Sequence, residues 1–325
     1  MIGQEGHVGG GRARVEPVPN FFIVGAPKCA TTAMDAYLAA HPDIYMCPHK
    51  EMHFFARDLK PDPDGVLQER YRRAFSGAGN ETIVGESSVF YMLSEVAARE
   101  IAAFQPRAKI LIMLRDPIDV IASHHSQIIY EGYETEKDLA RALALEESRR
   151  AAHAGRSLTI PEKVLHYRDV VRFADQIERF YAHFPREQVH VVFFDDVRRD
   201  VAAAYEGVLR FLGVDPGFRP EFQVRNANKE VRYRAMHRFL RKTPDWFTRM
   251  ARLFLPSARS RQRLRTALKR LNTRYTPRSP IPPDLRRRLA AELRPEIARL
   301  ERLLDRDLSH WCRCDSGDDS VRPMP

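Results

Sequence analysis

The segment Gly25–Thr32 combines residue types that bind a phosphate or sulfate group. An apolar run, 21–25, leads into a turn with Pro27 and Lys28, and Thr31 and Thr32 then open a helical pattern. A strand that turns into a helix aims free backbone N–H groups and the positive end of the helix dipole at one point. The segment is not a Walker A loop, because no Lys directly precedes the Thr pair. We expect an anion cradle formed by Lys28, Cys29, Ala30, Thr31 and Thr32.

A second anion site is expected where another apolar run ends. Arg115 directly follows the run 109–114, and Ser123 lies eight residues further on, about two helical turns away. An arginine fork and a serine hydroxyl can hold one phosphate together. If the two apolar runs are neighbouring strands, both anion sites face one crevice, as a nucleotide with two separated phosphates requires.

The elements that must position these residues alternate between strand and helix. Four apolar runs, at 21–25, 82–85, 109–114 and 189–194, are each followed by a helical pattern. Continuous apolar runs of this kind indicate parallel strands buried on both faces, and the alternation predicts an α/β fold with a mostly parallel sheet. Ligands of such sheets bind at the carboxyl ends of the strands. Four polar or turn residues lie at these ends: Gly25, Glu86, Arg115 and Asp195.

The rest of the chain is expected to be mostly helical. A helical insert spans 135–184, and the last long helical pattern is followed by Trp311, which we expect to anchor it. We predict a flexible leader at 1–19, one domain at 20–312 and a loose tail at 313–325. The part 225–312 forms a basic helical subregion of that domain.

Charge is distributed unevenly along the 325 residues, whose formal net charge is +10. The stretch 225–302 has 23 Lys and Arg but 6 Asp and Glu, so the remainder is slightly acidic. We expect the basic helices to form a lid over the acceptor site, with peripheral contact to a membrane surface as a further role; solvated helix faces are the simpler reading. Neutralising Arg249, Arg252 and Arg259 tests the lid.

Location and metal content follow from cysteines and hydropathy. No apolar run approaches the roughly 20 residues of a membrane span, and the N-terminus lacks the apolar core of a secretory signal. The four cysteines form no spaced disulfide framework, which favours the cytoplasm. Cys312 and Cys314 lack further ligands at metal-site spacing, so we expect no metal.

In combination, these motifs resemble the sulfotransferases that use 3′-phosphoadenosine 5′-phosphosulfate (PAPS). The strand, Gly-x-Pro-Lys turn and Thr pair resemble the family's 5′-phosphosulfate loop, and 114–117 with Ser123 resembles its 3′-phosphate motif. The segment Lys50–Phe55 resembles the heparan-sulfate-type and related bacterial branch. The resemblance extends over 20–311. It implies a P-loop-like three-layer fold with a helical C-terminal extension and an enzyme that transfers a sulfuryl group to a hydroxyl or amine.

The resemblance also implies roles for individual residues. Glu51 is the expected catalytic base, with His53 as its orienter or a second candidate and Glu86 as an alternative base. Lys28 is expected to stabilise the oxygen from which the sulfuryl group departs. Arg115, Ser123 and the more loosely placed Lys229 are expected at the 3′-phosphate, Lys229 together with Arg225 and Asn226.

Two departures from the family pattern bear on this interpretation. Ala30 replaces the usual glycine of the loop, which an alanine tolerates at negative φ. The segment 86–89 reads Glu-Ser-Ser-Val, without the lysine of glycosaminoglycan enzymes. We therefore leave the acceptor open among a carbohydrate, a glycolipid and a small natural product.

Two other classes of protein remain as alternatives. A P-loop nucleotide kinase shares the sheet and the cradle but needs a metal-holding aspartate and a Gly-Lys-Ser/Thr loop. A non-catalytic nucleic-acid binder is suggested by the basic charge alone, and no zinc spacing or RNA-binding strand motif supports it. We expect no nucleic-acid partner, and the sequence leaves the oligomeric state open.

Overall fold

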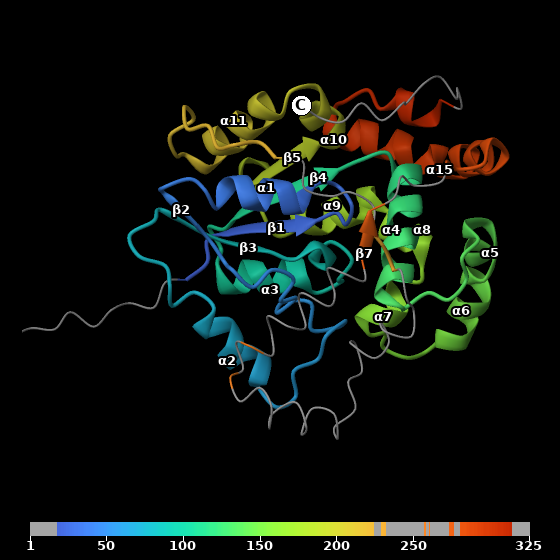
Figure 1. Ribbon diagram of the computed structural model, residues 1–325, viewed down its shortest axis with the longest axis horizontal. Coiled ribbons are helices and arrows are strands. Elements are labelled where there is room, and N and C mark those ends of the chain that lie inside the picture. The colour runs from blue at the N-terminus through green and yellow to red at the C-terminus, as the bar shows by residue number, and fades with distance from the viewer. Residues whose placement is uncertain are drawn as a thin grey trace, which may run out of the picture.

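Five parallel strands form the central sheet of the computed structural model, in the order β2-β3-β1-β4-β5 (Figure 1). The structure describes residues 18–223, 229–231, 257, 260, 273–275 and 280–313. The strands are β1 (Phe21–Gly25), β2 (Ile44–Met46), β3 (Ile83–Ser87), β4 (Lys109–Leu114) and β5 (Val189–Phe193). The predicted α/β fold with a parallel sheet is confirmed. Each of the four apolar runs supplies a strand, although Thr82 precedes β3 and Phe194 already belongs to the following helix.

Two details of the sheet differ from the sequence prediction. The edge strand β2 was missed because it has three residues and pairs with β3 alone. Strand β3 continues through Glu86 and Ser87, so Glu86 lies inside the strand and is fully buried. Gly85 lets β3 lie close to β1, since a Cβ there would lie 2.9 Å from Cδ1 of Phe21.

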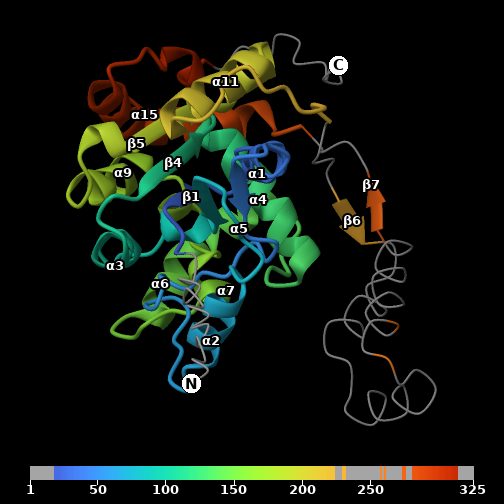
Figure 2. The same cartoon turned by 90° about the vertical axis from the view of Figure 1, so that its left-hand side faces the viewer.

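Helices cover both faces of the sheet. Helices α1 (Thr31–Leu38) and α11 (Val201–Leu212) lie on one face, and α3 (Ala97–Phe104) and α9 (Phe173–Tyr181) lie on the other (Figures 1 and 2). The remaining described helices are α2 (Val66–Arg73), η1 (Val89–Tyr91), α4 (Pro117–Glu131), α5 (Leu139–Ala144), α6 (Glu146–His153), α7 (Ile160–Lys163), α8 (Tyr167–Val170), η2 (Arg186–Gln188), α10 (Phe194–Arg199), α15 (Pro283–Leu304) and η3 (Ser309–Cys312). The predicted helical insert is thus a series of short helices, α5 to α9.

The C-terminal part packs back onto the sheet domain. Helix α15 lies against α9 and α4, and the following Trp311 is buried with its Nε1–H donating to Asp195 over 2.8 Å. The predicted anchoring role of Trp311 is confirmed. A short antiparallel ribbon, β6 (Lys229–Val231) with β7 (Thr273–Tyr275), places β6 beside α4 (Figure 2).

Several sequence predictions fall outside the described residues. Arg249, Arg252 and Arg259 of the expected lid are among them, as are most of the leader and the tail. The predicted domain boundaries therefore stay predictions.

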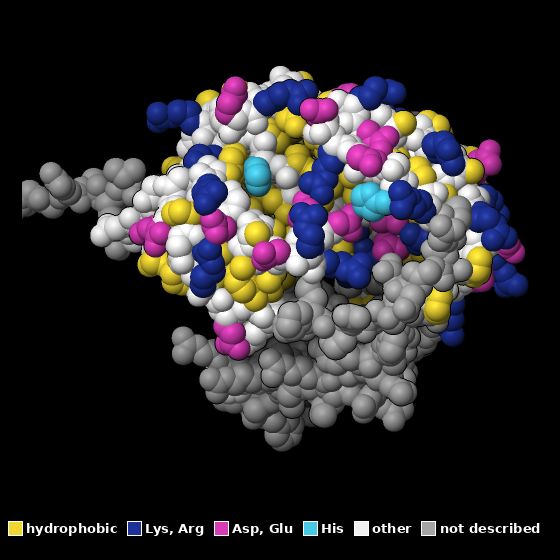
Figure 3. Space-filling model, turned by 90° about the horizontal axis from the view of Figure 1, so that it is seen from above, with side chains coloured by type: hydrophobic (Ala, Val, Ile, Leu, Met, Phe, Trp, Pro, Cys, Tyr) yellow, Lys and Arg dark blue, Asp and Glu magenta, His cyan; other side chains and the backbone are white. Residues whose placement is uncertain are grey.

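The described surface mixes charges of both signs. Viewed from above, Lys and Arg side chains are interspersed with Asp and Glu side chains (Figure 3). On α15, Arg286 and Arg299 pair with carboxylates of other elements, so part of the basic excess is neutralised within the fold. Within the described ranges, no helix is both long and apolar enough to cross a membrane.

Candidate active site

The predicted anion cradle lies in the loop between β1 and α1. In the part of the chain that the structure describes, the backbone N–H groups of Cys29, Ala30, Thr31 and Thr32 make no hydrogen bond. Lys28 is half-buried beside them. Free N–H groups at a helix N-terminus, next to a lysine, favour a bound phosphate or sulfate.

The backbone of this loop has two residues in the left-handed region. Lys28 has φ 66° and Ala30 has φ 67°, so the negative φ under which an alanine is well tolerated does not hold at position 30. A non-glycine residue in this region costs about 1–2 kcal/mol. Glu51 and His53 also have positive φ, so four of the five such non-glycine residues in the described chain belong to the candidate site. Strained backbone of this kind concentrates at functional sites.

Lys28 contacts a residue that the sequence analysis missed. Its Nζ donates to Oε1 of Gln127 over 3.2 Å, and the Gln127 amide donates to Glu131 over 2.7 Å. Gln127 lies on α4 one helical turn after Ser123, so its spacing from the predicted serine is the signal that could have identified it. The contact links the cradle loop to the helix of the second anion site.

Arg115 lies at the end of β4, and β4 is paired with β1. The two predicted anion sites therefore begin on neighbouring strands, as expected. The Arg115 guanidinium stacks over Phe194 at 4.6 Å and donates to Asp119 over 2.8 Å. Ser123 is buried on α4.

The positive charges of Lys28 and Arg115 both act on the pKa of the Cys29 thiol. Burial raises the pKa of Cys29 to about 12, while Arg115 and Lys28 each act to lower this pKa. The two cations therefore lie near the same buried thiol. The structure thus brings the cradle and Arg115 together at one edge of the sheet.

The third predicted ligand of the 3′-phosphate is placed only by its backbone. Lys229 opens β6, which lies beside α4, the helix that carries Ser123. Its side chain lies outside the described residues, as do Arg225 and Asn226.

Glu51 lies in the loop after β2 with partners on both carboxylate oxygens. Its Oε1 is 3.2 Å from Nζ of Lys50, and its Oε2 accepts from the backbone N–H of Val89 over 2.9 Å. The same Oε2 is 3.5 Å from Nε2 of His53. The Glu51 side chain is 36% exposed, so an acceptor can reach this carboxylate.

His53 is held in a buried, neutral state. Burial, together with the positive charges of Lys60 and Lys50, lowers the pKa of His53 to about 3. Its ring stacks on Phe90 with 5.2 Å between the ring centroids, and its backbone N–H donates to Ser88. A neutral imidazole beside Glu51 can orient the carboxylate, whereas it does not serve as a charged group near pH 7.

The buried Glu86 carboxylate accepts hydrogen bonds from three neighbouring hydroxyl groups. It accepts from Ser88 over 2.6 Å and from Tyr71 and Tyr91 over 2.9 Å. Complete burial raises the pKa of Glu86 to about 7. Because Glu86 has no exposed surface, its place in the fold is that of a support for Ser88, whose hydroxyl holds the backbone of His53.

Asp35 on α1 is a second residue that the sequence analysis missed. Its Oδ1 is buried and has no hydrogen-bond partner among the residues that the structure describes. Burial raises the pKa of Asp35 to about 6, and the charges of Lys50 and Glu51 act on it in opposite directions. A carboxyl group of α1 therefore lies near the Lys50–Glu51 pair. The sequence pattern of this helix did not indicate that proximity.

Two neighbouring histidines have structural partners. His124 bonds to the backbone oxygen of Val164 and His125 to that of Glu136. Burial lowers the pKa of His124 to about 4. Neither contact involves a predicted site residue.

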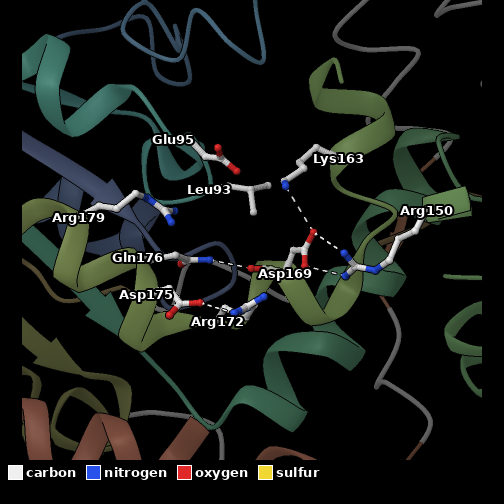
Figure 4. Close-up of a pocket in the computed structure, with 9 residues that line it drawn as sticks. All are labelled: Leu93, Glu95, Arg150, Lys163, Asp169, Arg172, Asp175, Gln176 and Arg179. Carbon is white, nitrogen blue, oxygen red and sulfur yellow. Dashed lines mark hydrogen bonds and ion pairs between the residues drawn. The ribbon is translucent and has the colours of Figure 1, made fainter. Parts of the chain in front are cut away.

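A separate polar cavity of about 340 Å³ lies among α7, α8, α9 and the segment before α3 (Figure 4). Its charged side chains largely pair with one another: Asp169 contacts Arg150 and Lys163, and Arg172 contacts Asp175. None of the predicted site residues lines it. Within the described ranges, no group of three or more His, Cys, Asp or Glu side chains could hold a metal ion.

Comparisons with known proteins agree with this geometry. The sulfotransferase domain family matches residues 18–243. The human bifunctional heparan sulfate N-deacetylase/N-sulfotransferase 3 is 29% identical over 220 residues, covering 62% of this chain and 23% of the relative. Rat carbohydrate sulfotransferase 15 is 28% identical over 165 residues, covering 38% of this chain and 29% of the relative. The chain thus spans about a quarter of the length of these curated relatives.

A solved structure covers more of the chain. The crystal structure of a sulfotransferase from Alicyclobacillus acidocaldarius is 32% identical, covers 91% of this chain and 100% of its own, and has a TM-score of 0.67. The family match, the shared fold and the loop geometry agree. The chain belongs to the sulfotransferase family.

Proposed function

We propose that this sulfotransferase takes its sulfuryl group from PAPS and transfers it to a hydroxyl or amine of a carbohydrate-type acceptor by in-line displacement. The observation that supports the proposal is the pairing of β1 with β4, because the cradle loop follows the carboxyl end of β1 and Arg115 follows that of β4. Family membership favours sulfuryl transfer over the nucleotide kinase and nucleic-acid-binding alternatives.

The described residues fit such a donor. Lys28, Cys29, Ala30, Thr31 and Thr32 would hold the 5′-phosphosulfate, because the N–H groups of the last four have no hydrogen-bond partner in the described chain and Lys28 adds a positive charge. Arg115, Ser123 and Lys229 would hold the 3′-phosphate; the Nε of Arg115 is buried and has no partner in the described chain. PAPS, when bound, supplies an activated sulfuryl group.

The chain's own residues then act by position and charge. Lys28 stabilises the negative charge that develops on the departing oxygen, and the N–H groups of the cradle share this task. Glu51 accepts the proton of the acceptor, with neutral His53 orienting its carboxylate. A sulfuryl group carries less negative charge than a phosphoryl group, so we propose that one lysine and backbone donors suffice without a metal.

The acceptor proposal rests on the relatives. Those compared above are named for heparan sulfate and carbohydrate sulfation. Glycan, glycolipid and small natural-product acceptors all stay within the proposal. The reason is that Ser87 occupies the position at which glycosaminoglycan enzymes tend to have a lysine. We also propose a cytoplasmic enzyme, in keeping with the buried thiols of Cys29 and Cys47, which form no disulfide within the described chain.

Transfer of radiolabelled sulfate from PAPS tests this function. The panel contains an unsulfated polysaccharide with free amines, its N-acetylated form, a glycolipid and a simple phenol. We expect label on one of the sugar acceptors, with a matched loss in Glu51→Gln and none in the exposed Glu147→Gln control. Label on the phenol alone would refute the carbohydrate acceptor, and the two polysaccharides distinguish an amine from a hydroxyl.

A further inference from the structure

Arg286 connects the C-terminal helix to the start of α4. It lies in the first turn of α15, and its Nη2 is 2.6 Å from Oδ2 of Asp116. Its Nη1 is 3.0 Å from Oδ1 of Asp119. The other oxygen of Asp119, Oδ2, accepts from Nη2 of Arg115 over 2.8 Å. One carboxylate is thus shared between two guanidinium groups from distant parts of the chain.

This cluster is largely shielded from water. The Arg115 side chain is 19% exposed, and that of Asp116 is 12% exposed. Asp116 also caps α4, because its side chain accepts from the backbone N–H of Ile118 over 2.8 Å. In such surroundings an unpaired carboxylate is costly, and removing one partner of a buried ion pair destabilises a protein. Arg286 supplies the positive charge that Asp116 needs.

Arg286 also limits how much of Arg115 the carboxylates occupy. The Arg115 guanidinium has five N–H donors, and its hydrogen bond to Asp119 uses Nη2. Without Arg286, Arg115 would be the guanidinium left beside these two carboxylates in the described chain, and we expect its fork to turn toward them. With Arg286 present, the Arg115 guanidinium donates to Asp119 through Nη2 and stacks on the ring of Phe194. The remaining donors are then available to a phosphate.

We propose that Arg286 is a positioning residue for Arg115, which it holds ready for the 3′-phosphate by neutralising Asp116 and Asp119. The inference rests on the proposed function, because it assumes that Arg115 binds the 3′-phosphate of the donor. It assigns a role to a residue of the basic C-terminal part that is distinct from a lid or a membrane contact.

The test compares two ligands that differ in the 3′-phosphate: 3′-phosphoadenosine 5′-phosphate (PAP) and adenosine 5′-phosphate, titrated by calorimetry into the full chain. We expect Arg286→Met to weaken PAP binding tenfold to a hundredfold and to change adenosine 5′-phosphate binding less than twofold. Arg286→Lys should recover part of the PAP affinity. The control is Arg287→Met, since Arg287 is exposed and pairs with Asp284 on its own helix; both affinities should stay at the wild-type value.

Three results would overturn the proposal: unchanged PAP affinity in Arg286→Met, an equal loss for both ligands, or an equal loss in Arg287→Met. If Arg286→Met does not fold, as judged by circular dichroism, the double variant Arg286→Met, Asp116→Asn removes the uncompensated carboxylate. Because Asp119 would still lack its Arg286 partner, a folded double variant should prefer PAP over adenosine 5′-phosphate less strongly than the wild type does. A preference equal to that of the wild type would contradict the proposal. Failure of the wild type to bind PAP would instead refute the proposed function.

Discussion

The ammonium Nζ of Lys28 lies 3.2 Å from Oε1 of Gln127 and donates a hydrogen bond to it. The contact joins the loop after β1 to the middle of α4, so the lysine of the cradle is oriented by the helix that also carries Ser123. Gln127 is itself fixed by its bond to Glu131. Two elements that the sequence presents as separate motifs are therefore in direct contact.

Removing the Gln127 amide should impair turnover more than donor binding. A hydrogen bond to a charged group contributes about 1.5–3 kcal/mol, so we expect Gln127→Leu to lower kcat by about tenfold or more. Affinity for PAP should fall less, since the backbone donors remain. Steady-state rates at saturating PAPS and calorimetry measure the two effects. Gln68→Leu, on the exposed face of α2, is the control, and a kcat equal to that control would refute the role of Gln127.

Replacing Ala30 by glycine should stabilise the protein, although most such changes destabilise. Ala30 has φ 67°, a conformation that glycine adopts without strain. Relief of the strain, offset by the greater freedom of glycine in the unfolded chain, predicts a gain of up to about 1 kcal/mol in the free energy of unfolding. The matched control, Ala36→Gly in the helical part of α1, should lose about 0.5–1 kcal/mol. Urea denaturation compares the two, and a loss of equal size at both positions would contradict this assignment of strain.

The proposed role of Glu51 as the base can be tested separately from donor binding. Glu51 is the exposed carboxylate of the site, and removal of a general base typically costs 10²- to 10⁴-fold in rate. We expect Glu51→Gln to lose about this much in kcat while PAP affinity stays within twofold. A Glu51→Gln enzyme with wild-type kcat, measured with any acceptor from the labelled-sulfate panel, would exclude Glu51 as the base.

Glu86 should give the fold a characteristic pH dependence. Its pKa is raised from 4.5 to about 7 by burial, so the folded state binds this proton more tightly than the unfolded state does. Its contribution to stability is fully present below pH 4.5 and is lost as the pH rises through 7. The loss is on the order of 3 kcal/mol.

Thermal unfolding of the wild type and Glu86→Gln between pH 4.5 and 8 measures this contribution. The Tm difference between them should move in favour of the glutamine variant as the pH rises. The comparison is made as a difference because His53, whose pKa is lowered to about 3, shifts stability in the opposite direction with pH in both proteins. A Tm difference that is constant with pH would show that the Glu86 pKa is not raised.

Much of the fold and part of the site could be predicted from the sequence. Strand β1 is an apolar run, and so is β4 after Lys109. Their buried side chains match the prediction because a strand covered on both faces reads as a continuous apolar run. Lys28 and Arg115 followed from their places at the ends of these strands. The short edge strand β2 could not be predicted, because three residues give no period.

The residues that were missed depend on contacts between distant segments. Arg286 stands 167 residues from Asp119 in the sequence, and only the packing of α15 on α4 brings them together. The positive φ of Ala30 is another property of the folded loop. It could not be predicted from the residue type, because alanine rarely adopts a positive φ. Such features are fixed by tertiary structure and leave no local pattern.

The most direct test of the central claim is the binding of PAP without metal. Thermal shift is measured with PAP in the presence of a chelator, with ATP and Mg²⁺, and with duplex DNA, for the wild type, Lys28→Ala and Arg115→Ala. We predict strong stabilisation of the wild type by PAP alone and its loss in both variants, because Lys28 and Arg115 lie at the ends of paired strands. Greater stabilisation by ATP and Mg²⁺, or by DNA, than by PAP would contradict the account.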